Sequence, residues 1–255
     1  MELTTSLPKA KVFLYFLLLF MVVTVVYSNH FGNAFHFDDS HTIQNNLYIR
    51  DIKNIPLFFK DATTFSSLPP NQSYRPIVSA SLAIDYWMDK GYNLFYFHLS
   101  SFVLFLLQGA LLFFFIYKIL DISFRNPWNF MIATLATALY LLHPANAETI
   151  NYIIARSDLQ STFCVLLALV LYMYSTLSRR WFLYLLPVGV GILAKPPAAM
   201  FAPILFFYIL LFETEFPLNK LFVKENLSVL FVVLKKSLPS FIFRALLFLF
   251  IDKMT

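Results

Sequence analysis

Residues 95–119 read FYFHLSSFVLFLLQGALLFFFIYKI, and this stretch decides the fold class. At about 1.5 Å of rise per residue, a helix of this length crosses the hydrocarbon core of a membrane, which is about 30 Å thick. Lys118, close to its end, is the only Lys, Arg, Asp or Glu within it. The stretch therefore predicts a membrane-spanning α-helix.

Six further apolar runs predict that the chain crosses the membrane about seven times. These runs cover residues 12–27, 130–142, 159–177, 181–193, 198–212 and 238–251. Composition agrees, since 59% of the 255 residues are hydrophobic and 13% are charged, whereas soluble domains are roughly 45 to 50% apolar. The prediction is an all-α, polytopic helix bundle that forms a single module over residues 1–255.

The composition also argues against other classes of protein. The 31 phenylalanines, the 5 glycines and the lack of alternating apolar and polar residues disfavour a membrane β-barrel. The net charge of +5 does not indicate nucleic-acid binding, because the basic residues stand at the ends of apolar runs and form no stripe. The single cysteine, Cys164, lies inside an apolar run and excludes an internal disulfide.

Lysines and arginines mark every second connection between the apolar runs, which predicts the orientation in the membrane. Cytoplasmic loops retain such residues, so we place these connections in the cytoplasm. They carry Lys9, Lys11, Lys118, Arg125, Arg179, Arg180, Lys220 and Lys224. The long loop of residues 28–94, the loop of residues 143–158 and the turn at Lys195 then face outward. Within the long loop, residues 76–88 predict a helix lying along the membrane surface.

Asp38 and Asp39 are the strongest chemical signal in the long outward loop. Repulsion between adjacent carboxylates, together with partial desolvation, raises the pKa of one of them, which suits a general base that takes a proton from a hydroxyl group. Asp38 is the first candidate for this base, and we expect Asp39 to support it. The alternative is that the Asp-Asp-Ser sequence caps a helix beginning near His41.

The loop of residues 143–158 brings His143, Glu148, Arg156 and Asp158 between two apolar runs. Ionisable groups at membrane depth are functional candidates, and an arginine binds a lipid phosphate through two charge-assisted hydrogen bonds. The alternative is an ion pair of Arg156 with Asp158 or Glu148 that fixes helix packing. The spacing of these residues gives little support to a zinc site.

Lys195 and Arg75 are two further cations at the predicted outer surface. Lys195 stands in a tight turn before two prolines, where an ammonium neutralises a leaving phosphate or reaches the lipid head groups. Arg75 precedes the predicted surface helix and is a candidate for binding phosphate or head groups. Because three outward segments contribute ionisable residues at one membrane surface, we expect a single site for a lipid-linked sugar phosphate.

These motifs, in this order and spacing, resemble those of the multi-span GT-C glycosyltransferases. The similarity covers about residues 12–213 and is closest to the transmembrane and tetratricopeptide-repeat O-mannosyltransferases, including bacterial relatives. It rests on Phe35-His36-Phe37-Asp38-Asp39, Tyr74-Arg75-Pro76, Phe97-His98-Leu99, His143-Pro144 with Glu148, Arg156-Ser157-Asp158 and Leu193-Ala194-Lys195-Pro196. Alanine replaces the glycine that usually precedes the arginine, and Pro196 replaces the glutamate that eukaryotic members carry.

The resemblance implies transfer of mannose or another hexose, with inversion, from a polyprenyl- or dolichyl-phosphate donor to a hydroxyl group of a protein or glycan acceptor. Family members carry more spans followed by repeats, so we expect an incomplete module. The resemblance places the catalytic carboxylates at Asp38 and Asp39, and two adjacent carboxylates do not by themselves specify a Mg²⁺ or Mn²⁺ ion. The form of the lysine motif favours a bacterial inner membrane, with the endoplasmic reticulum as the alternative.

Two other functions remain as alternatives. A transporter or flippase of a lipid-linked or small polar substrate also places ionisable residues between spans. The sequence contains no inverted repeat that would support it. An inactive membrane scaffold, left by truncation, is the third interpretation.

Overall fold

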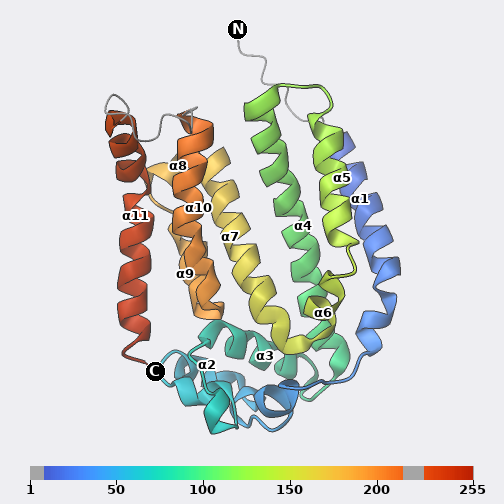
Figure 1. Cartoon of the computed structure of the whole chain (residues 1–255). Helices are drawn as coiled ribbons and strands as arrows, with labels where there is room; N and C mark the ends of the chain where they lie inside the picture. Colours follow the sequence, from blue (N-terminus) through green and yellow to red (C-terminus); the bar gives the residue numbers. More distant parts are fainter. Residues whose placement is uncertain (1–8, 215–226, 255) are drawn as a thin grey trace.

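The computed structural model describes residues 9–214 and 227–254 (Figure 1). The chain is 81% helical, and the residues in these two ranges form no strand. The predicted all-α fold class is therefore confirmed.

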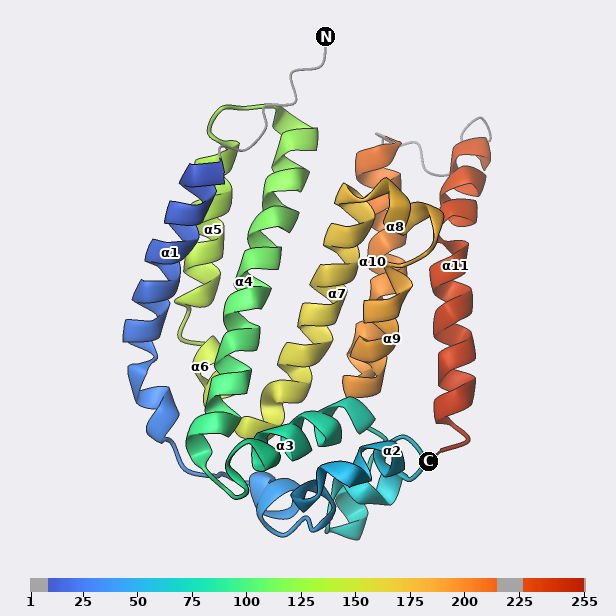
Figure 2. The same ribbon diagram turned by 180° about the vertical axis from the view of Figure 1, so that it is seen from behind.

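In the described part of the chain, the longer apolar helices run side by side and form a bundle (Figures 1 and 2). They are α1 Lys9–Val26, α4 Leu94–Phe124, α5 Asn129–Leu141, α7 Arg156–Tyr174, α9 Leu185–Ala194, α10 Phe201–Tyr208 and α11 Leu227–Ile251. Four further helices connect or cover them: α2 Ile55–Phe58, α3 Pro76–Asp89, α6 Asn146–Asn151 and α8 Thr176–Arg180. Short 3-10 or π turns are η1 Ser28–Gly32, η2 Ser40–Gln44, η3 Tyr48–Arg50, η4 Ile52–Asn54, η5 Ala62–Phe65, η6 Pro69–Asn71, η7 Ile153–Ala155, η8 Pro196–Met200 and η9 Ile209–Glu213.

Three helical segments of the described chain are long and apolar enough to cross a membrane: Leu94–Phe124, Ile153–Tyr174 and Pro196–Glu213. Three shorter apolar helices stand beside them: Ala10–Val26, Asn129–Leu141 and Leu185–Ala194. Helix α11 has 25 residues but includes Lys235, Lys236 and Arg244. Length and composition thus support three crossings, and crossing by all seven helices remains a prediction.

Large apolar side chains cover the outside of the bundle. Leu139 on α5 is 72% exposed, Leu186 on α9 is 66% exposed and Phe231 on α11 is 68% exposed. An apolar surface spread over several helices marks contact with a membrane or another apolar partner. The bundle is therefore consistent with a membrane protein.

The segment between α1 and α4 folds over one end of the bundle (Figure 2). Helix α3 lies across this end, close to the predicted boundaries of residues 76–88. Its residues Val78 and Leu82 are buried in a cluster that also contains Phe97 of α4 and Ala194 of α9. Besides any contact with a membrane surface, α3 therefore has a packing role, because its apolar residues fill the space between the loop and the ends of α4 and α9.

The basic connections lie at the other end of the bundle. Helix α1 begins there, α4 ends there near Lys118, and α8 carries Arg179 and Arg180 there (Figure 1). Lys220 and Lys224 lie outside the described residues. The loop and the basic connections are thus at opposite ends, and the assignment of these ends to the two sides of a membrane remains a prediction.

Gly191 permits the close approach of α9 to α7, and we expect its replacement to be costly. A Cβ atom at this position would lie 2.8 Å from Cys164 Cβ and 3.0 Å from Ala198 Cβ, neither of which can rotate away. Gly191→Ala should therefore lower the free energy of unfolding by about 1–3 kcal/mol, as overpacking does in other cores. Unfolding titrations in detergent measure this change. Gly32→Ala is the control, since a Cβ atom there meets nothing within 4 Å; equal stability of the two variants would contradict the packing argument.

Candidate functional site

A polar pocket of about 650 Å³ opens at the loop-covered end of the bundle. Its walls come from four parts of the chain: the start of the long loop, the segment leading into α3, the α6–α7 connection and the turn after α9. The lining residues are Asp38, His41, Thr42, Phe65, Pro70, Asn71, Gln72, Ser73, Arg75, Glu148, Thr149, Tyr152, Ile154, Ala155, Ser157, Asp158 and Lys195.

Five of the residues predicted from the sequence line this pocket together. They are Asp38, Arg75, Glu148, Asp158 and Lys195. The other three, Asp39, Arg156 and His143, are not among its lining residues.

Asp38 presents its carboxylate to the pocket. Its side chain is 57% exposed, and Oδ1 lies 3.3 Å from Nε2 of His41. Its backbone N–H donates a hydrogen bond of 3.0 Å to the hydroxyl of Tyr152, which ties the long loop to the α6–α7 connection. The preceding residue, Phe37, has a φ of 43°, which is unfavourable for a residue with a side chain. Asp38 thus stands at a strained turn of the backbone, as functional residues often do.

Asp39 points away from the pocket and is fully buried. Its Oδ1 accepts the backbone N–H of Ile154 at 2.9 Å, and its Oδ2 accepts that of His36 at 3.0 Å. Burial raises the pKa of Asp39, and these hydrogen bonds oppose that effect. The alternative, in which this segment caps the following helix, is not observed for Asp39, whose side chain makes no capping hydrogen bond to that helix. Asp39 instead holds the start of the long loop against the α6–α7 connection.

Lys195 and Asp158 form an ion pair at the edge of the pocket. The Nζ atom of Lys195 donates to both carboxylate oxygens of Asp158, at 2.6 and 2.7 Å. The two side chains are 27% and 48% exposed, so water still reaches them. Lys195 has extended backbone angles, which end α9 before two prolines begin η8. The ammonium is therefore held in the pocket by a carboxylate.

Arg75 is a half-buried cation in the pocket wall. Its guanidinium lies over the ring of Phe65, with 5.2 Å between Cζ and the ring centroid. Among the residues that the structure describes, no carboxylate lies within 4 Å of it. Burial lowers the pKa of Arg75, while the charges of Asp158 and Asp38 act in the opposite direction. An arginine remains protonated under these conditions and is available to bind an anion.

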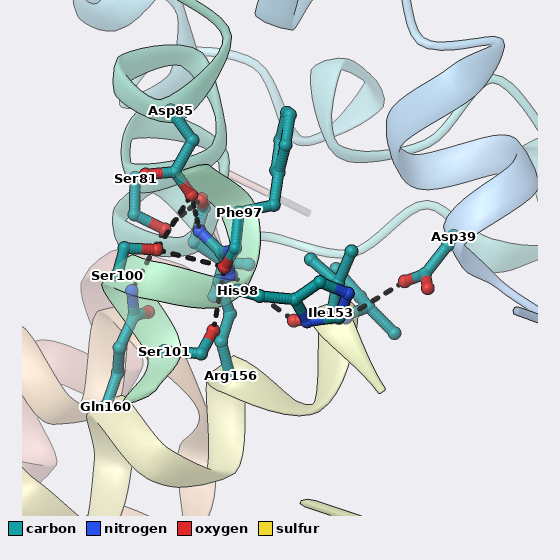
Figure 3. A network of polar contacts seen from close by, with 12 residues as sticks. Asp39, Ser81, Asp85, Phe97, His98, Ser100, Ser101, Ile153, Arg156 and Gln160 are labelled. Carbon is teal, nitrogen blue, oxygen red and sulfur yellow. Dashed lines mark hydrogen bonds and ion pairs between the residues drawn. The ribbon is translucent and has the colours of Figure 1, made fainter. Parts of the chain in front are cut away.

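Arg156 lies behind the pocket wall, where only 2% of its side chain is exposed. Figure 3 shows its guanidinium directed towards Asp85 of α3, with which it forms an ion pair. It also donates to the carbonyl oxygen of Phe97 at 2.7 Å and to that of Ile153 at 3.2 Å. The alternative pairing with Asp158 or Glu148 is not observed, because the Arg156 guanidinium is directed to Asp85 of α3 and to the carbonyl oxygen of Phe97 in α4. The same orientation keeps it away from the pocket, where it was predicted to bind phosphate.

His143 and Glu148 occupy the α5–α7 connection. His143 is exposed, and its Nδ1 accepts the backbone N–H of Ala145 at 3.1 Å, so it stabilises a turn. Glu148 is also exposed and contributes a carboxylate to the pocket rim. Within residues 9–214 and 227–254, no group of three or more His, Cys, Asp or Glu side chains is placed to hold a metal ion. The two adjacent aspartates in particular diverge, since Asp39 faces backbone N–H groups.

Three residues of the site were not recognised in the sequence: His41, Asp85 and Tyr152. His41 follows Asp38 by three residues, which is the spacing of neighbours on a helical turn. Asp85 is a carboxylate within the largely apolar helix α3, and a carboxylate buried there requires a partner. Burial raises the pKa of Tyr152 to about 12, so its hydroxyl stays protonated. No local pattern marked Tyr152, because its role depends on contact with a loop far away in the sequence.

Comparison with known proteins identifies one distant relative. The chain is 26% identical to Protein O-mannosyl-transferase F38B6.6 of Caenorhabditis elegans over 193 residues, which cover 69% of this chain and 27% of the relative. The chain thus spans little more than a quarter of that protein's length. No family model matches the chain, and no solved structure matches it. The similarity supports a distant, glycosyltransferase-like relationship.

Proposed function

We propose that this chain is a membrane glycosyltransferase module that transfers a hexose, such as mannose, from a polyprenyl- or dolichyl-phosphate donor to a hydroxyl group of a protein or glycan. The observation that carries the proposal is the pocket in which a carboxylate, Asp38, faces the same space as the cations Arg75 and Lys195. The distant similarity to a protein O-mannosyl-transferase supports the same class of reaction.

The pocket contains the groups that such a transfer requires. The Asp38 carboxylate accepts the proton of the acceptor hydroxyl while the hydroxyl oxygen forms a bond to the anomeric carbon of the sugar. The bond between that carbon and the phosphate oxygen breaks, and the lipid phosphate leaves with the electron pair. Attack opposite the leaving group inverts the anomeric carbon. Preorganised charges near the departing oxygen stabilise the developing negative charge.

Arg75 is the main candidate for holding the phosphate. It is the pocket cation without a carboxylate partner among the described side chains, whereas Lys195 is already paired with Asp158. A planar guanidinium binds two phosphate oxygens at once, which fixes the donor as well as stabilising charge. Lys195 adds a second positive charge, and Asp158 sets its position. Arg156, with its hydrogen-bond donors directed into the protein, supports the wall from behind.

The pocket lies at the loop-covered end of the spans, where a lipid phosphate at the membrane surface meets a hydroxyl group from the aqueous side. We place this end on the outer side, either the periplasmic face of a bacterial inner membrane or the lumen of the endoplasmic reticulum. The opposite end, with its lysines and arginines, would face the cytoplasm.

Replacing Arg75 tests the assignment of the phosphate site. Arg75→Met keeps a long apolar side chain over Phe65 but removes the charge, and kcat/KM for the lipid donor should fall about 10²-fold, as when one preorganised donor is lost at other sites. The measurement is incorporation of labelled sugar from a polyprenyl-phosphate donor by the full chain in membranes.

Arg50→Met is the matched control for this variant. Arg50 also lies over an aromatic ring in the long loop, 5.5 Å from the centroid of Tyr92, but does not line the pocket. Its replacement should leave transfer within about twofold of the original protein. Equal losses in the two variants would remove Arg75 from the site. Movement of the labelled lipid across vesicles without labelling of any acceptor would favour the transporter alternative.

A further inference from the structure

We infer that His41 is the proton-accepting partner of Asp38, so that the proton leaving the acceptor hydroxyl is held between the Asp38 carboxylate and Nε2 of the imidazole. This inference rests on the proposed glycosyl transfer and adds a second residue to its base. The starting observation is the 3.3 Å distance between Nε2 of His41 and Oδ1 of Asp38 at the pocket wall.

The orientation of the His41 ring is fixed by Ser66. The Nδ1 atom of His41 lies 2.9 Å from Oγ of Ser66, and this hydroxyl lies 3.2 Å from the carbonyl oxygen of Leu68. The Asn71 amide nitrogen, which only donates, lies next to Nε2 of His41, so Nε2 is the unprotonated nitrogen of the neutral ring and Nδ1 carries the proton. Ser66 Oγ accepts a hydrogen bond from this Nδ1–H group, and its own hydroxyl proton is directed to the Leu68 carbonyl.

With Nδ1 protonated, a neutral His41 directs the lone pair of Nε2 into the pocket. The side-chain amide nitrogen of Asn71 lies 3.0 Å from Nε2 and donates to that lone pair. Asp38 Oδ1 is the other neighbour of Nε2, and a carboxylate and a lone pair attract each other only when a proton lies between them. The pair is therefore arranged to take up one proton, either as a carboxylic acid beside imidazole or as a carboxylate beside imidazolium.

The difference in exposure between Asp38 and His41 indicates which of them contacts the acceptor hydroxyl. Asp38 is 57% exposed, whereas the His41 side chain is 14% exposed. A hydroxyl group entering the pocket therefore meets Asp38 first, and the proton passes from its oxygen to the carboxylate and then to Nε2. Protonation of Nε2 ends the hydrogen bond that the Asn71 amide nitrogen donates to it, and Asp38 Oδ1 is then the acceptor for the new N–H bond.

Other charges around the pocket influence this equilibrium but do not replace His41. The charged residues that line the same pocket are Arg75, Glu148, Asp158 and Lys195, and Tyr152 adds a protonated hydroxyl. Lys195 and Asp158 neutralise each other in their ion pair. Asp38 is the carboxylate within ion-pair distance of His41 among the described residues. A proton on His41 is thus stabilised chiefly by Asp38.

The first test measures kcat and KM separately for transfer by the full chain. His41→Gln keeps a hydrogen-bond donor for Ser66 but cannot hold a proton, so we expect kcat to fall about 10- to 100-fold while KM for the lipid donor changes less than about twofold. His36→Gln, an exposed histidine of the same loop, is the control and should leave both constants unchanged. Equal kcat for His41→Gln and His36→Gln would overturn the role of His41.

The second test does not depend on sugar transfer. The chain has five histidines, and ¹⁵N-histidine NMR of the full protein in detergent follows each of them, with His41→Gln assigning the signal of interest. In Asp38→Asn the Nε2 resonance of His41 should move, because the carboxylate beside that nitrogen is gone, whereas the Nδ1 resonance, which faces Ser66, should stay in place. An unmoved Nε2 resonance would overturn the pair. A moved resonance in a protein without any transfer would keep the pair but reject both the proposed function and its catalytic use.

Discussion

Asp38→Asn is expected to lower the rate of sugar transfer by between about 10² and 10⁴, the contribution that a general base makes in many enzymes. Asparagine has nearly the same shape as aspartate but cannot accept a proton at neutral pH. The loss should appear in kcat, since Asp38 acts on the transferred proton, and the lipid phosphate is held elsewhere. The measurement is the initial rate of labelled-sugar transfer at saturating donor.

Asp38→Asn should leave the fold intact. The Asp38 side chain is exposed, and the substitution retains the hydrogen bond of its backbone N–H to Tyr152 and changes only the side-chain contact with His41. Thermal unfolding in detergent should therefore be unchanged. The control is Asp51→Asn in the same loop, where aspartate caps a short helix and asparagine caps it equally well. Transfer by Asp38→Asn within twofold of the original rate would exclude Asp38 as the base.

Asp85→Leu is expected to produce the largest loss of stability, about 3–5 kcal/mol, because it leaves the guanidinium of Arg156 buried without its counter-charge. Only 2% of the Arg156 side chain and 3% of the Asp85 side chain are exposed. Ser100 also donates to Asp85 at 2.9 Å, so the substitution breaks a network that joins α3, α4 and α7 (Figure 3). Unfolding titrations in detergent measure the change in free energy.

A double variant separates the ion pair from simple packing. In Asp85→Leu with Arg156→Met, both charges are replaced by apolar groups, and much of the lost stability should return. Lys236→Met is the control at an exposed pair, whose partner is Glu213 at 2.8 Å, and should cost less than about 1 kcal/mol. A double variant as unstable as Asp85→Leu would show that the charges themselves do not account for the effect.

The Arg156 network also bears on the pocket. Arg156 stands between Ala155 and Ser157, which both line it. Its hydrogen bonds to the carbonyl oxygens of Phe97 and Ile153 hold this backbone against α4. Loss of the Asp85 partner should therefore disturb the pocket wall as well as the bundle, whereas Asp38→Asn should affect transfer alone.

Much of the fold was predictable because helices in a membrane leave long apolar runs. The run at residues 95–119 became α4, and residues 159–177 fell largely within α7. Helix α3 was also predicted nearly to its ends, since Pro76 favours the first turn of a helix and the chain turns near Gly91. The predicted seven crossings are supported only in part, because three of the apolar helices are short for a membrane.

The site was predicted in part, and the reason is visible in the two aspartates. Sequence alone gives Asp38 and Asp39 the same chemistry and nearly the same position. The tertiary structure buries Asp39 against the backbone of Ile154 and leaves Asp38 in the pocket. Similarly, Arg156 had carboxylates nearby in sequence, but its partner Asp85 is 71 positions away.

The amino-acid sequence by itself determined that the chain is helical and apolar, with its ionisable groups gathered mainly in the connections between apolar runs, because hydrophobicity and helix signals are local properties. The tertiary structure alone decided which of those groups share a pocket and which are paired behind its wall. Pairing depends on how the long loop docks on the helix ends, and that docking follows from contacts between residues far apart in the chain.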